Sequence, residues 1–377
     1  MIQKSAGGKR SWLRSWRGLG LVSLLATVVA VGAVSAGATR LVTWPTAAQE
    51  IATSGISNVP FCGTKQITLA VLDGYGVNAW SQESYTAVRS EAAKCKNVKV
   101  ITAAGGGDLQ KSISDISSSV AQGANAIVVI PDFGAAELPA IQQATAAGTK
   151  VVPWAANPGG KAGTDYVSYV DWIPSYAGTI WAQWMAGVLH GKGNVIYLGG
   201  PAGNPVGLDA LANMVKTFKK YPGIKLLTGN TGFAVTNWDP ATAQKVTAAL
   251  LAKYPKIDGI ITNYGTDALS AARAFQAAGR KLVPVAGADA NGLSCLYKKN
   301  NIPLASVSTR NWLGRIAARK AIAAAEGLPN KEPSLIKLGF WEDTVHGKPY
   351  KCVAGAPADY YPSDKLTLAQ ISKYGTP

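Results

Sequence analysis

The sequence has few residues of the kinds that carry catalysis or bind transition metals, with two histidines and four cysteines among 377 residues. His190 and His346 lie far apart, and no Gly-x-Ser-x-Gly motif is present. Nothing assembles a nucleophile, a base and an orienting group, so we expect no catalytic residue and no enzyme. There is no Cys-x-x-Cys pair either, so we expect disulfides and no metal, with a structural zinc site as the alternative.

Phosphate-binding motifs are also missing. The glycine-rich stretch 105–108 (GGGD) lacks the Gly-Lys-Ser/Thr ending of a phosphate loop and the spacing of a dinucleotide fingerprint. We therefore expect no cofactor. The stretch is better interpreted as a tight turn, in which Asp108 caps the helix that follows.

Acidic residues are absent from the first 48 positions. Residues 1–17 carry five basic side chains, an apolar run follows from Leu19 to about Ala36, and small residues stand at 36–38 and 47–48. This order predicts a signal peptide within 1–48, cleaved at about 36–48, and hence export to the periplasm. The alternative is an uncleaved anchor, because a run of roughly 18 residues is near the minimum that spans a bilayer.

No cysteine directly follows the apolar run and no Arg-Arg pair precedes it, which argues against a lipid anchor and against twin-arginine export. The whole chain has a formal charge of +16, but the chain after residue 48 keeps 31 basic and 21 acidic residues. Its lysines occur as short scattered pairs such as Lys219-Lys220. Because nucleic-acid binding needs a clustered basic stripe, we expect no nucleic-acid partner.

All four cysteines lie in the exported part: Cys62, Cys95, Cys295 and Cys352. An even number of cysteines in an oxidising compartment predicts disulfides. Four cysteines allow three pairings, and their spacing alone does not choose among them.

The chain after the signal segment alternates β-branched runs with helical segments. Its length of about 330 residues suits two lobes better than one core. Strands are predicted at 66–72, 98–103, 126–130, 150–154, 194–198, 224–228, 259–262, 282–286 and 304–308, with helices at 136–147, 175–190, 241–254 and 267–278. Nearly continuous apolar runs such as 126–130 (AIVVI) are typical of strands buried on both faces. The sequence therefore predicts an α/β fold of parallel sheets with helices on both sides.

An internal repeat supports two lobes of like topology. Residues 126–154 align without a gap to 257–285, matching glycines, a leucine, an Ala-Gly step and a Lys-x-Val-Pro end. The repeat sets Asp132-Phe133 opposite Asn263-Tyr264, each pair directly after a predicted strand. In open α/β sheets ligands bind outside the carboxyl ends of the strands, so both pairs are candidate ligand contacts.

Over nearly the whole exported part, the sequence resembles the periplasmic sugar-binding proteins of the ribose-binding type. The resemblance is carried by the segments 67–80 (ITLAVLDGYGVNAW), 122–132 (QGANAIVVIPD), 147–153 (AGTKVVP), 258–267 (DGIITNYGTD) and 285–289 (VAGAD). It implies a type I periplasmic binding protein, with two doubly wound lobes joined by a three-segment hinge. It also implies capture of a sugar or polyol for a permease of an ABC transporter in the membrane, by a monomer.

On this resemblance we assign residues 62–172 and 309–340 to the N-terminal lobe. Residues 173–308 and 341–355 form the C-terminal lobe, and 356–377 form a C-terminal tail that packs over one lobe. Crossings between the lobes are expected near 171–175, 306–311 and 338–343. The fold favours the pairs Cys62–Cys95 and Cys295–Cys352, because each would tie the end of a segment to a nearby helix.

The resemblance also implies which side chains face the cleft: Asn78, Trp80, Asp132, Trp154, Asp171, Trp238, Asn263, Tyr264, Asp289 and Asn311. Aromatic faces suit the C–H faces of a sugar ring, while Asp and Asn suit its hydroxyl groups. For Asp171, capping of the next helix is an equal alternative. Trp181 and Trp184 lie three residues apart on a predicted helix and are interpreted as core.

The sequence departs from the family pattern in one respect. Sugar binders of this type commonly carry an Asp-Arg pair after the fourth strand, where this chain reads Trp154-Ala155-Ala156, and loop 199–209 contains no arginine. The cleft is therefore expected to be poorer in charge and richer in tryptophan than a ribose site. An alternative function follows, in which a periplasmic receptor presents a partly apolar or aromatic ligand to a membrane sensor.

Overall fold

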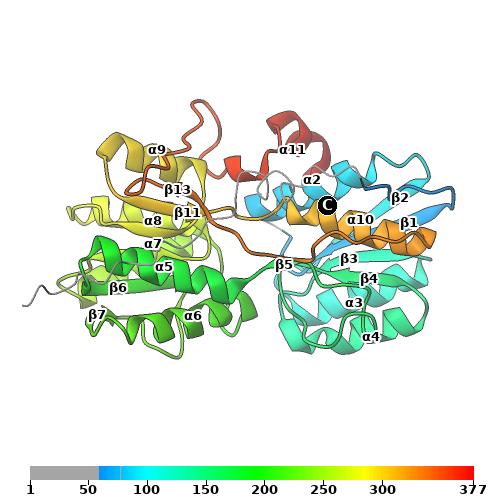
Figure 1. Ribbon diagram of the computed structural model, residues 1–377, viewed down its shortest axis with the longest axis horizontal. Helices are drawn as coiled ribbons and strands as arrows, with labels where there is room; N and C mark the ends of the chain where they lie inside the picture. Colours follow the sequence, from blue (N-terminus) through cyan, green and yellow to red (C-terminus); the bar gives the residue numbers. More distant parts are fainter. Residues whose placement is uncertain (1–58, 77) are drawn as a thin grey trace, which may run out of the picture. The chain divides into compact units, whose positions relative to one another are not determined.

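The computed structural model describes residues 59–76 and 78–377, so the predicted signal peptide lies outside the described residues. The described chain contains two large sheets that are flanked by helices, and a third sheet of only two strands (Figure 1). It thus has the predicted α/β class. None of its helices is long and apolar enough to cross a membrane, in the part of the chain that the structure describes.

The N-terminal lobe is built on a parallel sheet of strand order β2-β1-β3-β4. Helices α2 and α10 contact one another on one face, and α3 and α4 do so on the other (Figure 1). Apolar side chains of β1 and β3 such as Leu72 and Ile127 are buried between these layers. The elements are β1 (Ile67–Asp73), α2 (Ala79–Ala92), β2 (Val98–Ala104), α3 (Leu109–Ala121), β3 (Ala126–Ile130), α4 (Leu138–Ala146), β4 (Lys150–Pro153) and α10 (Leu313–Glu326).

The C-terminal lobe is built on a second sheet of order β13-β11-β10-β9-β6-β7, in which β8 also pairs with β6. All of its pairs are parallel except β11 with β13. Helix α5 packs closely on α6, because Gly178 has no side chain: a Cβ there would lie 2.0 Å from the Ala210 carbonyl oxygen. The elements are α5 (Pro174–Val188), β6 (Lys192–Gly199), α6 (Pro205–Phe218), β7 (Gly223–Leu226), β8 (Ala234–Val235), α7 (Pro240–Lys253), β9 (Gly259–Thr262), α8 (Gly265–Ala277), β10 (Val285–Ala288), α9 (Asn291–Asn300), β11 (Leu304–Val307) and β13 (Phe340–Asp343).

Most predicted elements are confirmed, and those at 126–130 and 259–262 have the predicted ends. The strand predicted at 282–286 begins only at Val285, because Pro284 has no N–H to donate to the sheet. The helix predicted from 136 begins at Leu138, after a 3-10 turn, η1 (Gly134–Ala136). Asp108 caps α3 through its carboxylate, as predicted.

Within the described residues, three chain segments pass from one large sheet to the other. Two of them lie where crossings between the lobes were expected, and the third lies a few residues earlier than expected. The short strand β5 (Asp171–Trp172) pairs in parallel with β12 (Leu335–Ile336), outside both sheets. A further segment, residues 308–312, leads from β11 to α10. The crossing expected near 338–343 lies a few residues earlier, since β13 already belongs to the second sheet. The exact lobe boundaries stay a prediction.

Both favoured disulfides are present, Cys62–Cys95 and Cys295–Cys352. The first ties the segment before β1 to the end of α2, and the second ties α9 to the segment after β13. Trp181 and Trp184 are buried in α5, which confirms their assignment to the core. Residues 356–377 differ from the prediction, because they contact elements of both lobes rather than one.

Candidate ligand-binding site

A small cavity of about 40 Å³ lies where strands of both sheets end. A cavity of this size holds roughly three water molecules. Its walls come from the segments after β1, β3, β4, β8, β9 and β11, so most of them follow the carboxyl end of a strand. The lining residues are Asp73, Tyr75, Asn78, Trp80, Ser81, Ile130, Asp132, Ala155, Val206, Trp238, Asn263, Tyr264 and Arg310.

Trp80 forms the N-terminal aromatic wall of this cavity. It is the second residue of α2, and this helix begins here because the Asn78 side chain accepts a hydrogen bond from Ser81 N at 2.9 Å. The indole Nε1 of Trp80 donates to the Thr309 carbonyl oxygen at 3.0 Å. Its ring stacks on Trp154, with centroids 5.9 Å apart. Trp154 is 1% exposed and supports Trp80 from behind without lining the cavity.

Trp238 and Asn263 form the wall contributed by the C-terminal lobe. The Trp238 Nε1 donates to Asn263 Oδ1 at 3.3 Å, which orients both side chains. The indole lies on Gly200, where a Cβ would come within 2.2 Å of the ring. Tyr75, from the N-terminal lobe, meets Trp238 edge to face at a centroid distance of 5.4 Å. The aromatic walls of the two lobes therefore touch.

Two neighbouring carboxyl groups, Asp73 and Asp132, line the N-terminal side. Burial raises the pKa of Asp73 to about 6. Burial raises the pKa of Asp132 well above its usual value, and the charges of Asp73 and Glu137 raise it further. Asp132 packs against Gly74, where a Cβ would lie 2.9 Å from its Oδ2. The Oδ2 of Asp73 accepts no hydrogen bond from the part of the chain that the structure describes.

Arg310 was not predicted from the sequence as a site residue. Among the described residues, Arg310 is the only cationic side chain that lines the cavity. Its Nε donates to Asp171 Oδ1 at 3.3 Å, and its Nη2 donates to the Ala155 carbonyl oxygen at 3.3 Å. Its guanidinium carbon lies 4.6 Å from the Trp172 ring centroid and 5.7 Å from that of Trp80. Stacking on aromatic rings is typical of a partly desolvated arginine.

Asp171 therefore anchors Arg310, and it does not cap a helix. The next helix, α5, follows Ile173 and has no side-chain cap. Asp171 is fully buried and also accepts from the Tyr169 hydroxyl at 2.5 Å and from Trp172 N at 2.8 Å. Burial raises its pKa, and the charge of Arg310 opposes that effect.

Asp289 and Asn311 lie directly behind the cavity wall. Asp289 accepts from Thr309 N at 2.8 Å and from the Ser363 hydroxyl at 2.8 Å, and burial raises its pKa to about 8. Asn311 donates to the Trp80 carbonyl oxygen at 3.0 Å. Neither residue lines the cavity.

Six of the ten residues predicted from the sequence line the cavity: Asn78, Trp80, Asp132, Trp238, Asn263 and Tyr264. The other four, Trp154, Asp171, Asp289 and Asn311, contact a lining residue or its neighbour. Contact of any of the ten with a ligand stays a prediction.

Three ionisable side chains, Asp73, Asp132 and Arg310, line the cavity, and the expectation that it is poorer in charge than a ribose site stays a prediction. Asp73 stands at the end of a predicted strand and Arg310 within an expected crossing, so both carried a positional signal. Val206 and Ser81 carried no such positional signal, because each side chain reaches the cavity from within a helix and not from the end of a strand. Among the described residues, no cluster of His, Cys, Asp or Glu has the arrangement of a metal site.

Two similar α/β lobes with a cavity at their facing strand ends define the type I periplasmic binding fold. The chain belongs to the periplasmic binding protein domain family, whose sequence profile matches residues 70–329. A curated relative is the xylitol-binding protein of Mycolicibacterium smegmatis, 27% identical over 314 residues, which are 81% of each chain.

Solved structures share the fold. The periplasmic binding component of the arabinose ABC transporter of Shewanella sp. ANA-3, bound to L-arabinofuranose, matches with a TM-score of 0.65 and 20% identity, over 72% of this chain and 90% of its own. A solute-binding protein of Burkholderia graminis in complex with D-arabinose matches with a TM-score of 0.65 and 20% identity, over 74% of this chain and 95% of its own.

Proposed function

We propose that this protein is the extracytoplasmic solute-binding component of an ABC importer, and that it binds a small polyol or sugar. The observation that carries this proposal is the composition of the cavity. Indole faces of Trp80 and Trp238 stand beside the carboxyl groups of Asp73 and Asp132 and the amide of Asn263.

This set of side chains suits a ligand with C–H faces and many hydroxyl groups. Carboxylates accept hydrogen bonds from hydroxyls, a guanidinium only donates, and an amide does both. Asp73 and Asp132 can therefore accept hydrogen bonds from ligand hydroxyl groups, while Arg310 donates to ligand oxygens. A hydrogen bond to a charged group contributes about 1.5–3 kcal/mol, against about 0.5–1.5 kcal/mol for a neutral pair. Arg310, and either carboxylate when ionised, can thus contribute more to binding than the neutral amide of Asn263.

The relatives support the same ligand class. The curated relative is named for xylitol, a polyol, and the solved structures hold pentoses. The alternative reading, a receptor for an aromatic ligand, is weakened by the charged groups at the cavity, because buried charges need hydrogen-bonding partners.

Ligand capture is proposed to proceed by closure of the two lobes. Contacts between the lobes already surround the cavity: Asn204 Nδ2 donates to the Asp132 carbonyl oxygen at 3.2 Å, and Tyr75 meets Trp238. A ligand that bonds to both walls favours the closed form by its differential affinity. The closed monomer is what the membrane permease would recognise outside the cytoplasm.

The test is a thermal-shift screen of the exported chain, from about residue 49, followed by calorimetry of the hits. Xylitol, arabitol, arabinose, ribose, inositol and small aromatic compounds form the panel. A ligand at 100 times its Kd should stabilise the protein by about 2.7 kcal/mol. Asp132→Asn should weaken binding of a polyol or sugar about tenfold, because it replaces one carboxyl oxygen by an NH2 group that cannot accept a hydrogen bond.

The exposed Asp359 provides the matched control, since Asp359→Asn makes the same chemical change at a residue that does not line the cavity. Stabilisation by aromatic compounds alone would contradict the proposed ligand class while leaving the family membership intact. Equal affinities of Asp132→Asn and Asp359→Asn would contradict the proposed site.

A further inference from the structure

The C-terminal tail is held first by the C-terminal lobe. At the start of α9, Gly292 N donates to the Ala358 carbonyl oxygen and Asn291 N to the Tyr360 carbonyl oxygen, both at 2.8 Å. The Asn291 amide Nδ2 also donates to the Ala356 and Pro357 carbonyl oxygens at 3.1 Å. These bonds fix the tail beside α9 and the end of β10.

The tail then reaches the N-terminal lobe within a few residues. Tyr361 is fully buried in the core of the C-terminal lobe, with its ring 6.3 Å from that of Tyr264. Its backbone N donates to Glu83 Oε1 of α2 at 3.0 Å. One residue therefore carries its side chain in one lobe and a backbone hydrogen bond in the other.

The next turn, η2 (Pro362–Asp364), holds the crossing segment 308–312. The Ser363 hydroxyl contacts Asp289 Oδ1 and Ser308 Oγ, both at 2.8 Å. Asp364 accepts from the Thr309 hydroxyl at 3.0 Å and from Trp312 N at 3.3 Å. Ser363 and Asp364 are both buried.

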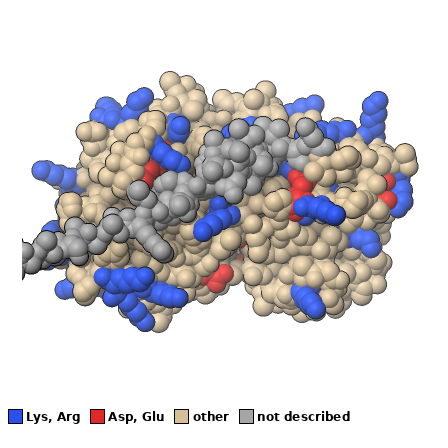
Figure 2. All heavy atoms as spheres, viewed as in Figure 1, with Lys and Arg blue, Asp and Glu red and all other residues tan. Residues whose placement is uncertain are grey.

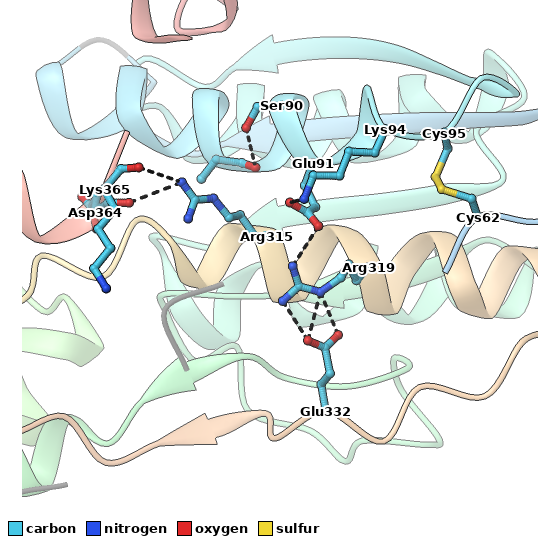
Figure 3. A network of polar contacts seen from close by, with 11 residues as sticks. Cys62, Ser90, Glu91, Lys94, Cys95, Arg315, Arg319, Glu332, Asp364 and Lys365 are labelled. Carbon is cyan, nitrogen blue, oxygen red and sulfur yellow. Dashed lines mark hydrogen bonds and ion pairs between the residues drawn. A yellow bond between two sulfur atoms is a disulfide. The ribbon is translucent and has the colours of Figure 1, made fainter. Parts of the chain in front are cut away.

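The end of the tail is fastened to the N-terminal lobe. Arg315 of α10 donates to the Asp364 carbonyl oxygen at 3.4 Å and the Lys365 carbonyl oxygen at 3.5 Å (Figure 3). Helix α11 (Leu368–Tyr374) packs on α2, where Arg89 donates to the Tyr374 carbonyl oxygen at 2.8 Å and to that of Thr376. Figure 1 shows α11 beside α2 in the N-terminal lobe.

We propose that residues 356–376 form a fourth connection between the lobes, which restrains their opening and positions the 308–312 segment. The consequence reaches the cavity through that segment. Thr309 accepts the indole hydrogen bond of Trp80, and Arg310 is its neighbour. Ser363 and Asp364 are thus positioning residues, which act on the cavity through Thr309 and touch no ligand. This inference goes beyond the proposed function, because it concerns the unliganded protein.

A tail merely packed on one lobe would rotate with it and leave the lobe angle unaffected. A tail bonded to both lobes must break bonds when they separate, because its bonded residues 358 and 364 are only six positions apart. Opening of the lobes is then opposed by the hydrogen bonds that tail residues 360–365 make to the two lobes. The two arrangements predict different behaviour once the tail is loosened.

The experiment compares the exported wild-type chain with three variants, all without ligand. Ser363→Ala removes the hydroxyl bonds to Asp289 and Ser308, and a chain ending at Gly355 removes the connection. Ser372→Ala is the matched control, since Ser372 lies exposed on α11 of the same tail. Small-angle X-ray scattering measures the radius of gyration, and hydrogen exchange with mass spectrometry measures protection of residues 308–312.

We expect a larger radius of gyration for Ser363→Ala and a still larger one for the truncated chain. Exchange at 308–312 should be at least about fivefold faster in Ser363→Ala, because each of the two lost hydrogen bonds contributes about 0.5–1.5 kcal/mol. Ser372→Ala should match the wild type in both measurements. If the truncated chain fails to give a wild-type circular dichroism spectrum, the comparison of the two serine variants decides.

Wild-type scattering and wild-type exchange in Ser363→Ala would overturn the proposal. Because no ligand is used, that result would leave the proposed function untouched. Conversely, a wild type that responds to no polyol or sugar in the thermal-shift screen would contradict the proposed function and not the fourth connection.

Discussion

The indole rings of Trp80 and Trp154 stack with their centroids 5.9 Å apart and their planes 23° from parallel. Trp80 is half-buried and lines the cavity, whereas Trp154 is buried behind it. In this pair, Trp80 faces the cavity and Trp154 supports it from within the N-terminal lobe.

Replacing each tryptophan should separate binding from stability. Trp80→Ala should weaken polyol or sugar binding at least about tenfold, because it removes an aromatic face from the cavity. Trp154→Ala should lower the free energy of unfolding by about 3–5 kcal/mol, because it leaves a void in a packed interior. Calorimetry and urea unfolding of both variants check the division. Equal loss of stability in the two variants would show that Trp80 too is mainly structural.

The ion pair of Arg310 and Asp171 permits a double-mutant test. Arg310→Met should destabilise the protein by about 3–5 kcal/mol, because Asp171 is left buried without its cation. The double variant Asp171→Asn with Arg310→Met should recover most of that stability. Its affinity for ligand should nevertheless stay below that of the wild type, because the double variant lacks Arg310, which lines the cavity. Wild-type affinity in the double variant would reduce Arg310 to a structural role.

Both disulfides should stabilise the folded protein. Removing one by a double Cys→Ser change should cost about 2–5 kcal/mol. The Cys295–Cys352 bond closes 57 residues and the Cys62–Cys95 bond closes 33. Loop-closure entropy makes the longer loop worth about 0.5 kcal/mol more. Thermal unfolding of the two double variants, compared with the reduced wild type, measures both effects; a reduced wild type with an unchanged Tm would contradict them.

Stability should fall as the pH rises from about 5 to 8. Burial raises the pKa of Glu83 to about 10, of Asp289 to about 8 and of Asp364 to about 7. Over this range the native protein holds these protons while the unfolded chain, with ordinary carboxyl pKa values, has lost them. The free energy of unfolding therefore decreases with pH wherever the native state binds more protons.

Glu83→Gln should flatten that dependence by about one proton, or about 1.4 kcal/mol per pH unit. The amide keeps an oxygen for the Tyr361 N–H but does not titrate in this range. Urea unfolding between pH 5 and 8 measures the slope, with the exposed Asp359→Asn as control. A slope equal to that of the wild type would show that Glu83 is ionised in the native protein.

The basic side chains on the face of the molecule shown in Figure 2 form no single stripe. Lysine and arginine side chains are scattered over the face shown in Figure 2, with few acidic groups between them. This agrees with the scattered lysine pairs of the sequence.

Much of the fold followed from local pattern. The ends of the strands at 126–130 and 259–262 were predicted correctly, because Pro131 follows the first apolar run and the polar Asn263 follows the second. The strand predicted at 282–286 begins too early, because the apolar character extends through Pro284, whereas Pro284 has no N–H to donate to a neighbouring strand. Local sequence cannot report whether a partner strand requires an N–H at a given position.

The sequence by itself determined the α/β class, the duplicated lobes and the aromatic and carboxyl groups that directly follow strands, because strand ends meet at one edge of a parallel sheet. Only the tertiary structure decided that Arg310 lines the cavity, that Asp289 lies behind it, and that the tail joins both lobes. These outcomes depend on contacts such as Arg310 with Asp171, 139 residues apart in the chain. Such long-range contacts leave no local periodicity to read, since burial and the need for a hydrogen-bonding partner are satisfied only once the lobes have packed.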